Sequence, residues 1–227
     1  MKVHVVGGGP AGLYFAYLMN RDGAGHDITV FEQNPRDATY GFGVVFSRPV
    51  MDRLEAADAI LVNAIRPERE AWDDLTIVHR GERIPIDGNG FASISRLALL
   101  RCLHGLCESA GVDLRFGTTL ISPDDLNTAD LVVGADGVNS VVRHASQEAF
   151  RPSIGASVNR FIWYGTTKVF DTLTLTFRHS EAGAFVAHHY RYSPTMSTFI
   201  VECGAAAWAA SGLGEMTPAE SLIYCQQ

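Results

Sequence analysis

The start of the chain carries three glycines at a spacing that restricts the local fold to few solutions. The pattern G-x-G-x-x-G is formed by Gly7, Gly9 and Gly12. A β-branched run at Val3–Val6 precedes it, and an apolar stretch of good helix formers follows at Leu13–Met19. A second apolar run at Asp27–Phe31 predicts another strand. A strand, a tight turn, a helix and a second strand within about 30 residues have the size of a parallel βαβ unit.

The same turn has the features of a phosphate-binding loop. The first glycine permits the turn, the second lets a pyrophosphate approach the backbone, and the third lets helix and strand pack closely. Phosphates would meet unpaired N–H groups and the positive end of the helix dipole. Glu32 ends the second strand, where a carboxylate accepts hydrogen bonds from an adenosine ribose and repels a 2′-phosphate. The alternative is a glycine-rich turn without a ligand. The predicted dinucleotide-binding residues here are Gly7, Gly9, Pro10, Ala11, Gly12, Glu32 and Gln33.

Further elements follow in an order typical of an α/β protein. Helical spacing runs from Ser47 to Leu61, and a hairpin with its bend at Arg80–Glu82 is predicted over Asp74–Ile86. The other predicted elements are a helix over Arg96–Ala110 and strands at Val112–Phe116, Thr118–Ile121 and Leu131–Val133. Because the last run is continuously apolar, we expect a strand buried on both faces of a parallel sheet.

The pattern changes after about residue 151. Threonine alternates with leucine and phenylalanine over Thr172–Phe177, the period of a sheet with one buried face. Three more strands are predicted at Phe161–Tyr164, Phe185–Tyr190 and Thr198–Cys203. Four strands without a long helix between them predict an antiparallel sheet. We therefore expect two domains, residues 1–150 with an inserted hairpin at about 72–94, and residues 151–227. A capping box at Thr217–Glu220 predicts one more helix near residue 227.

Composition excludes several classes of function. Hydrophobic residues at 47% and charged residues at 19% are typical of a globular protein, and a net charge of −7 argues against binding to nucleic acid. The four cysteines are too scattered for a disulfide framework or a common metal pattern. The sequence offers neither a signal peptide nor an apolar run of the ~20 residues that span a bilayer. We expect a cytoplasmic protein without a membrane or nucleic-acid partner.

The adjacent residues His188 and His189 suggest a metal site at first sight. Neighbouring residues on a strand point to opposite faces, so the two imidazoles would not bind one metal ion together. We predict no metal. A side chain of His189 or Tyr190 facing an aromatic substrate is a reasonable hypothesis, and packing within the sheet is the alternative.

A second motif resembles a known family. Residues Asp130–Arg143, DLVVGADGVNSVVR, resemble the second FAD signature of the para-hydroxybenzoate hydroxylase class of aromatic monooxygenases. The resemblance implies that Asp136 and Gly137 lie near the FAD pyrophosphate and ribityl chain. Arg96, in SRLALL, matches an arginine that the family places near the FAD phosphates. As a bare string Asp-Gly is only a turn signal, and Arg96 alone would be a solvated charge in the first turn of a helix.

Longer strings extend the resemblance over nearly the whole chain. Two strings resemble the salicylyl-CoA 5-hydroxylases and their aminobenzoyl-CoA relatives. They are GFGVVFS at Gly41–Ser47 and WDD at Trp72–Asp74. Two further strings resemble the violacein-pathway tryptophan hydroxylase. They are FIWYGTTKVFD at Phe161–Asp171 and TMSTFIVEC at Thr195–Cys203. Gly41–Val44 is expected to border the flavin.

The resemblance implies both a fold and a reaction. The fold is an α/β, Rossmann-like FAD-binding domain of the GR2 type with part of an antiparallel substrate domain. The activity is that of an FAD-dependent monooxygenase, with NADH or NADPH as electron donor. Such an enzyme inserts one atom of molecular oxygen into a small aromatic substrate through a flavin hydroperoxide. The substrate implied is an aryl-CoA thioester or an indole amino acid, and catalytic side chains remain unknown.

Two rival functions stay open on sequence grounds. One is another oxidoreductase on the same scaffold, either a geranylgeranyl-reductase-like or an NAD-only enzyme. The other is a non-catalytic FAD-binding fragment, because the family carries a third signature, a Gly-Asp pair, beyond the position matching residue 227. We therefore expect a C-terminally truncated chain with weak turnover by itself.

Overall fold

The computed structural model describes residues 1–120 and 128–227, and these form two compact units. The first unit comprises residues 1–40, 59–65 and 96–154. The second comprises residues 41–58, 66–95 and 155–227. Each unit is therefore built from three separate segments. The predicted division at residues 150 and 151 lies near the last of these boundaries, and the predicted hairpin insertion falls in the second unit.

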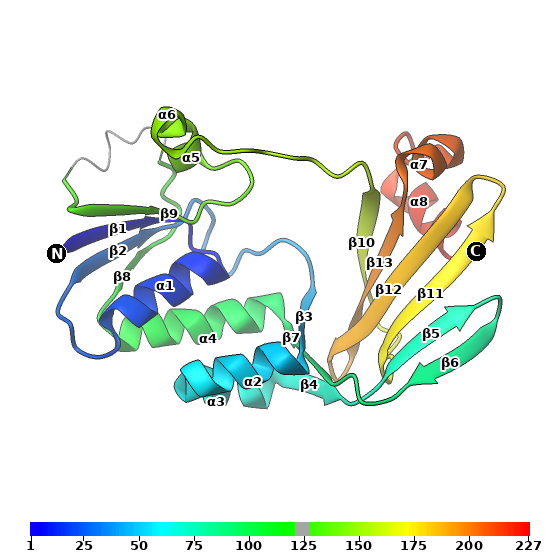
Figure 1. Cartoon of the computed structure of the whole chain (residues 1–227), viewed down its shortest axis with the longest axis horizontal. Helices are drawn as coiled ribbons and strands as arrows, with labels where there is room; N and C mark the ends of the chain where they lie inside the picture. Colours follow the sequence, from blue (N-terminus) through cyan, green and yellow to red (C-terminus); the bar gives the residue numbers. More distant parts are fainter. Residues whose placement is uncertain (121–127) are drawn as a thin grey trace. The chain divides into compact units, whose positions relative to one another are not determined.

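The first unit contains a parallel sheet of four strands in the order β8-β2-β1-β9 (Figure 1). The strands are β1 (Lys2–Val6), β2 (Asp27–Phe31), β8 (Asp113–Arg115) and β9 (Leu131–Gly134). The helices of this unit are α1 (Pro10–Asn20), α3 (Ala59–Ile65), α4 (Arg96–Ser109), α5 (Val141–Ala145) and α6 (Gln147–Phe150). Helix α1 follows β1 and precedes β2, which confirms the predicted βαβ unit.

The core of this unit lies between the sheet and helices α1 and α4, which pack against each other. Val3 and Val5 of β1 and Leu13 of α1 are completely buried. The Cys107 thiol donates a hydrogen bond to the Leu13 carbonyl oxygen at 3.1 Å, and burial raises the pKa of this thiol to about 12. Cys107 is thus a packing residue, as a scattered cysteine is expected to be.

The burial predicted for β9 is wrong. Leu131 and Val132 are 38% and 37% exposed, and among the described residues the strand pairs only with β1. A run of consecutive apolar residues predicts two covered faces, whereas β9 is the edge strand of the described sheet. The strand itself was predictable from the apolar run, but what covers its faces was not.

Two other predicted elements also differ from the structure. The helix expected from Ser47 to Leu61 is two helices, α2 (Arg48–Ala57) and α3, separated by Asp58 with φ −157° and ψ 81°. Apolar spacing persists across this break, so the pattern did not reveal it. The strand expected at Thr118–Ile121 is absent over residues 118–120, and Ile121 lies outside the described residues.

The second unit is built around a mainly antiparallel sheet in the order β10-β13-β12-β11-β5-β6 (Figure 1). Its strands are β5 (Leu75–His79), β6 (Glu82–Ile86), β10 (Arg160–Thr166), β11 (Leu173–Ser180), β12 (Gly183–Ser193) and β13 (Met196–Cys203). The four strands predicted after residue 151 and the hairpin are confirmed. The hairpin turns at Arg80 and Gly81, where φ is +52° and +83°.

A smaller sheet, helix α2 and two C-terminal helices complete the described part of the second unit. The order β3-β7-β4 joins β3 (Gly43–Ser47), β7 (Phe91–Ser95) and β4 (Arg69–Trp72), and a 3-10 turn spans Arg66–Glu68. The helices that follow β13 are α7 (Ala205–Ser211) and α8 (Pro218–Cys225). Helix α8 begins at the predicted capping box, in which Thr217 and Glu220 bond each other's backbone N–H groups. The α/β fold class is confirmed by this combination of a parallel sheet with helices and a mainly antiparallel sheet.

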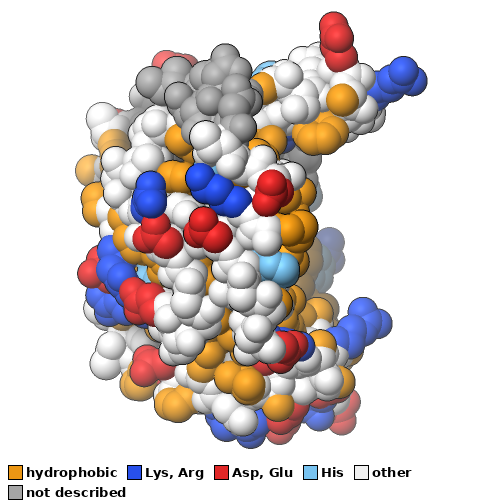
Figure 2. All heavy atoms as spheres, turned by 90° about the vertical axis from the view of Figure 1, so that its left-hand side faces the viewer, with side chains coloured by type: hydrophobic (Ala, Val, Ile, Leu, Met, Phe, Trp, Pro, Cys, Tyr) orange, Lys and Arg blue, Asp and Glu red, His pale blue; other side chains and the backbone are white. Residues whose placement is uncertain are grey.

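Charged side chains of both signs share the face of the molecule shown in Figure 2. Arginine and lysine side chains lie beside aspartate and glutamate there, with hydrophobic side chains between them. Within the described residues, no helix combines the length and hydropathy needed to cross a membrane.

Candidate nucleotide-binding site

The glycine turn between β1 and α1 has the geometry that its spacing predicts. Gly7 has φ +106°, and a Cβ atom there would lie 2.3 Å from the Ala135 carbonyl oxygen. A Cβ atom on Gly12 would lie 2.0 Å from the Gly7 oxygen. A Cβ atom on Gly9 would meet nothing within 4 Å. Gly7 and Gly12 are therefore required by the protein itself, whereas the space beside Gly9 is open for a ligand.

The Glu32 carboxylate holds the turn from the end of β2. Its Oε2 accepts a hydrogen bond from the Gly8 N–H at 2.8 Å. Its Oε1 accepts bonds from the Asn34 backbone N–H at 2.8 Å and from the Asn34 side-chain amide at 2.7 Å. Each carboxylate oxygen has two lone pairs, so Oε2 retains capacity for one further donor. A ribose hydroxyl is a donor of the right kind.

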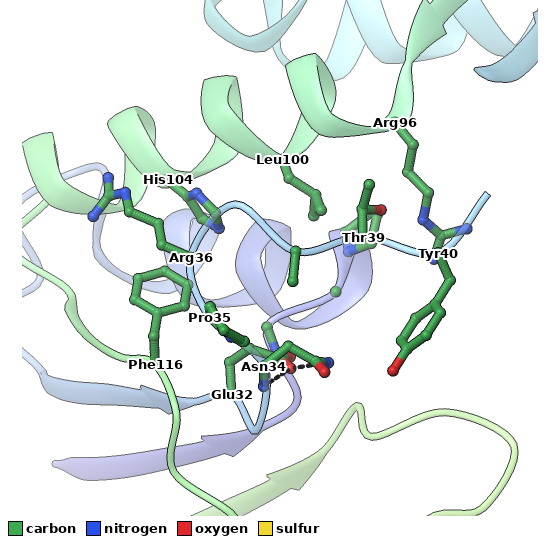
Figure 3. A pocket seen from close by; sticks show the side chains of 14 residues that line it. Glu32, Asn34, Pro35, Arg36, Thr39, Tyr40, Arg96, Leu100, His104 and Phe116 are labelled. Carbon is green, nitrogen blue, oxygen red and sulfur yellow. Dashed lines mark hydrogen bonds between the residues drawn. The ribbon is translucent and has the colours of Figure 1, made fainter. Parts of the chain in front are cut away.

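A pocket opens over this turn and is lined entirely by the first unit (Figure 3). Four of the predicted residues line it: Gly9, Pro10, Glu32 and Arg96. The other lining residues are Gly8, Asn34, Pro35, Arg36, Ala38, Thr39, Tyr40, Leu100, His104 and Phe116. The Arg96 side chain, at the start of α4, forms no hydrogen bond or ion pair with any described residue, so its guanidinium is available for an anion.

One end of the pocket combines two rings with an arginine. His104 and Phe116 meet edge to face with centroids 5.0 Å apart, and the Arg36 guanidinium lies 5.4 Å from the Phe116 centroid. Arg36 also forms an ion pair with Glu108 at 2.6 Å. Burial, followed by the nearby Arg36 charge, lowers the pKa of His104, so this imidazole is neutral at pH 7. Flat apolar surfaces and a guanidinium plane are suited to a purine base.

The loop after β9 contributes the Asp-Gly pair of the second motif. Asp136 Oδ2 accepts the Val141 N–H at 2.6 Å at the start of α5, whose N-cap residue is Ser140. Its Oδ1 is buried without a hydrogen-bond partner among the described residues. Gly137 has φ +81° and open space around its Cα. A buried carboxylate oxygen without a partner and an unhindered glycine fit the approach of a polar ligand at the carboxyl ends of the strands.

The remaining predicted residues have mixed placements. Gly7 and Gly12 shape the turn, while Ala11 and Gln33 do not line the pocket. Gly41–Val44 belongs to the second unit, where Gly41 packs against the Trp163 ring. Sequence reasoning missed the loop residues 34–40 and the pair His104 and Phe116. The available signal was their position in the chain. Residues 34–40 follow β2, His104 lies eight residues beyond Arg96 on α4, and Phe116 follows β8 directly.

Comparisons with known proteins agree with this geometry. The family of NAD(P)-binding Rossmann-like domains matches residues 5–40, which include the turn, Glu32 and the following loop. A salicyloyl-CoA 5-hydroxylase of a Streptomyces species is 41% identical over 98% of this chain and 43% of its own length. A protodeoxyviolaceinate monooxygenase of Chromobacterium violaceum is 37% identical over 99% of this chain and 61% of its own length. A 3-hydroxy-4-methyl-anthranilyl-[aryl-carrier protein] 5-monooxygenase of Streptosporangium sibiricum is 34% identical over 94% of this chain and 62% of its own length.

Over nearly its whole length, the chain is similar in sequence to one hydroxylase and two monooxygenases. The resemblance stated from the motifs is thereby confirmed, although the violacein-related relative is a protodeoxyviolaceinate monooxygenase instead of the tryptophan hydroxylase expected. A solved structure shows the same fold. Pseudomonas aeruginosa PqsL superposes on the chain with a TM-score of 0.73 at 20% identity, covering 100% of this chain and 66% of that protein. The chain spans between 43% and 62% of the length of these three relatives.

Proposed function

We propose that the first unit binds FAD and that the protein containing this chain hydroxylates an aromatic ring with NADH or NADPH and molecular oxygen. The pocket over the glycine turn carries this proposal, because it joins an open phosphate position at Gly9, a carboxylate at Glu32 and an unpaired arginine at Arg96. The named relatives support the reaction type.

Each residue of the site has a defined task in this proposal. The α1 N-terminus and Arg96 would hold the pyrophosphate, and Glu32 would accept a ribose hydroxyl. Arg36, His104 and Phe116 would enclose the adenine. Asp136 and Gly137 would lie next to the ribityl chain of FAD. Bound FAD would take two electrons from the nicotinamide and activate O2, so that one oxygen atom enters the ring and the other leaves as water.

The names of the relatives support a proposal for the substrate class. Salicyloyl, hydroxy-methyl-anthranilyl and amino-hydroxybenzoate groups are all benzene rings that carry hydroxyl or amino substituents. We propose the same class here, a small electron-rich aromatic acid or its thioester. A cytoplasmic location and the identities of the donor and the substrate remain predictions.

Substitution of Glu32 tests the cofactor site. We expect Glu32→Ala to weaken FAD binding by about 1–3 kcal/mol, because a hydrogen bond to the ribose is lost. Titration of the purified apoprotein with FAD, followed by flavin fluorescence, measures the change. Glu82→Ala, on the β5–β6 hairpin, is the control. Unchanged FAD affinity would remove Glu32 from the site, and a colourless protein that takes up no FAD would contradict the proposed function.

A further inference from the structure

Asn34 binds one oxygen of the Glu32 carboxylate with two donors (Figure 3). Its backbone N–H lies 2.8 Å from Glu32 Oε1, and its side-chain Nδ2 lies 2.7 Å from the same atom. A carboxylate oxygen has two lone pairs, so Oε1 has no capacity left for a ligand. The other oxygen, Oε2, accepts only the Gly8 N–H among the described residues. The two oxygens of this carboxylate are therefore unequal.

The side-chain amide of Asn34 has one orientation in this arrangement. A carboxylate accepts hydrogen bonds and donates none, so the amide nitrogen, and not the amide oxygen, faces Glu32. Hydrogen bonds to a charged acceptor are shorter and about twice as strong as neutral ones. Two of them on one oxygen fix the direction of the Glu32 side chain, so its position does not depend on a ligand.

The Asn34 backbone is itself held by the segment that follows β8. Its carbonyl oxygen accepts the Gly117 N–H at 3.1 Å, and the Glu32 carbonyl oxygen accepts the Thr118 N–H at 2.9 Å. The Glu32 N–H donates to the Arg115 carbonyl oxygen at 2.9 Å. A ligand-binding side chain is held precisely when the residue that supports it is fixed by contacts of its own. Asn34 meets this condition.

Gly8 allows the carboxylate to lie against the turn. A Cβ atom on Gly8 would lie 2.8 Å from the Glu32 Cβ and 3.1 Å from its Oε2. The pattern G-x-G-x-x-G leaves this position open, so the close approach of Glu32 explains the glycine found here. Gly8, Glu32 and Asn34 all line the pocket. The free lone pair of Oε2 is thus what this carboxylate offers to a ligand.

We propose that Asn34 is a positioning residue that makes Glu32 an acceptor for a single hydroxyl of the adenosine ribose. Because Asn34 occupies Oε1, only Oε2 meets the ribose, and the second ribose hydroxyl has no partner on this carboxylate. The inference rests on the proposed function, since it names the residue that sets how Glu32 binds FAD. Without the Asn34 side chain, either carboxylate oxygen could accept.

Two FAD analogues test the single contact. One lacks the 2′-hydroxyl of the adenosine ribose, and the other lacks the 3′-hydroxyl. We expect the apoprotein of the full protein to bind one analogue about tenfold more weakly than FAD, the effect of one hydrogen bond, and the other within about twofold. Calorimetric titration gives the three dissociation constants. In Glu32→Ala the two analogues should bind equally, within about twofold.

Substitution of Asn34 tests the positioning. Asn34→Ala removes the side-chain donor and frees one lone pair of Oε1. We expect FAD to bind about three- to tenfold more weakly, and the difference between the analogues to fall below about threefold, because the carboxylate is no longer fixed. Asn63→Ala is the matched control, since Asn63 is exposed on α3 of the same unit and does not line the pocket. It should bind all three compounds as the wild type does.

A double-mutant cycle separates positioning from a general effect on the loop. In the Glu32→Ala background, Asn34→Ala should change FAD affinity by less than about twofold, because the group that Asn34 positions is gone. An equally large loss with and without Glu32 would show that Asn34 supports only the loop, and would overturn the assignment.

Two further results would also overturn it. One is an Asn34→Ala protein with full FAD affinity and an undiminished difference between the analogues. The other is a wild type that loses affinity equally for both analogues, or for neither. These results leave FAD binding and hydroxylation intact, whereas a protein that takes up no FAD contradicts the proposed function and this inference with it.

Discussion

At the scale of single residues, Glu32 joins the structure of the turn to the binding of a ligand. Its two oxygens accept three protein hydrogen bonds, from Gly8 and Asn34, before any cofactor arrives. The sequence predicted the ribose contact but not these internal bonds. Loss of the carboxylate should therefore loosen the turn as well as remove a ribose partner, so Glu32→Ala is expected to lower the stability of the apoprotein too.

Two glycines of the same turn should respond differently to the same added methyl group. Gly12→Ala places Cβ 2.0 Å from the Gly7 oxygen, so we expect a loss of about 1–3 kcal/mol in the free energy of unfolding. Gly9 has φ −75° and an empty Cβ position, so Gly9→Ala should change stability by less than about 0.5 kcal/mol.

FAD affinity provides the second readout of this pair. Gly9→Ala should weaken FAD binding by about tenfold or more, because the methyl group occupies the approach of the pyrophosphate. Urea unfolding and FAD titration measure the two quantities separately. A stable Gly9→Ala protein with full FAD affinity would place the phosphates elsewhere.

The sequence predicted those site residues that belong to a motif and missed those that only the fold brings together. Gly9, Glu32 and Arg96 each stand at a position that a pattern marks. Phe116 follows β8 and His104 lies on α4, so their proximity depends on the packing of α4 beside the sheet. No local spacing in the sequence predicts a contact between residues on different elements.

At the scale of whole elements, prediction succeeded where the signal is local. Strand β2 has the predicted bounds because five consecutive residues share one pattern. The small sheet β3-β7-β4 was not predicted, since β3 pairs with residues of β7 that lie about 50 positions away, such as Gly43 with Ser95. The exposure of β9 shows the same limit: an apolar run specifies a strand but not what covers it.

Helix α8 offers a prediction about a single cap. The Thr217 hydroxyl accepts the Glu220 N–H, and the Glu220 carboxylate accepts the Thr217 N–H at 2.8 Å. The bonds from the Thr217 backbone N–H and hydroxyl lower the pKa of Glu220. We expect Thr217→Ala to destabilise the protein by about 1 kcal/mol and Thr217→Ser to be nearly neutral. Amide hydrogen exchange within residues 218–225 reports the loss, and equal protection in both variants would show that the cap contributes nothing.

At the scale of the whole molecule, the chain spans 43% of the length of the salicyloyl-CoA 5-hydroxylase that it matches. We expect residues 1–227 on their own to give weak or no NADH-dependent hydroxylation, in line with the alternative of a non-catalytic FAD-binding fragment. Oxygen consumption and chromatography of the aromatic products measure turnover. Robust hydroxylation by these residues alone would contradict this expectation.

The two compact units alternate along the chain, because each is assembled from three segments. Strand β5 lies before residue 80 in the sequence, and its parallel partner β11 begins only after residue 172. A cut near residue 150 would consequently leave β5 and β11 on different fragments, even though that position looks like a boundary between modules. Neither unit can be exchanged, expressed or lost as one continuous stretch of gene, and a protease nick near residue 150 should leave two fragments that still hold together.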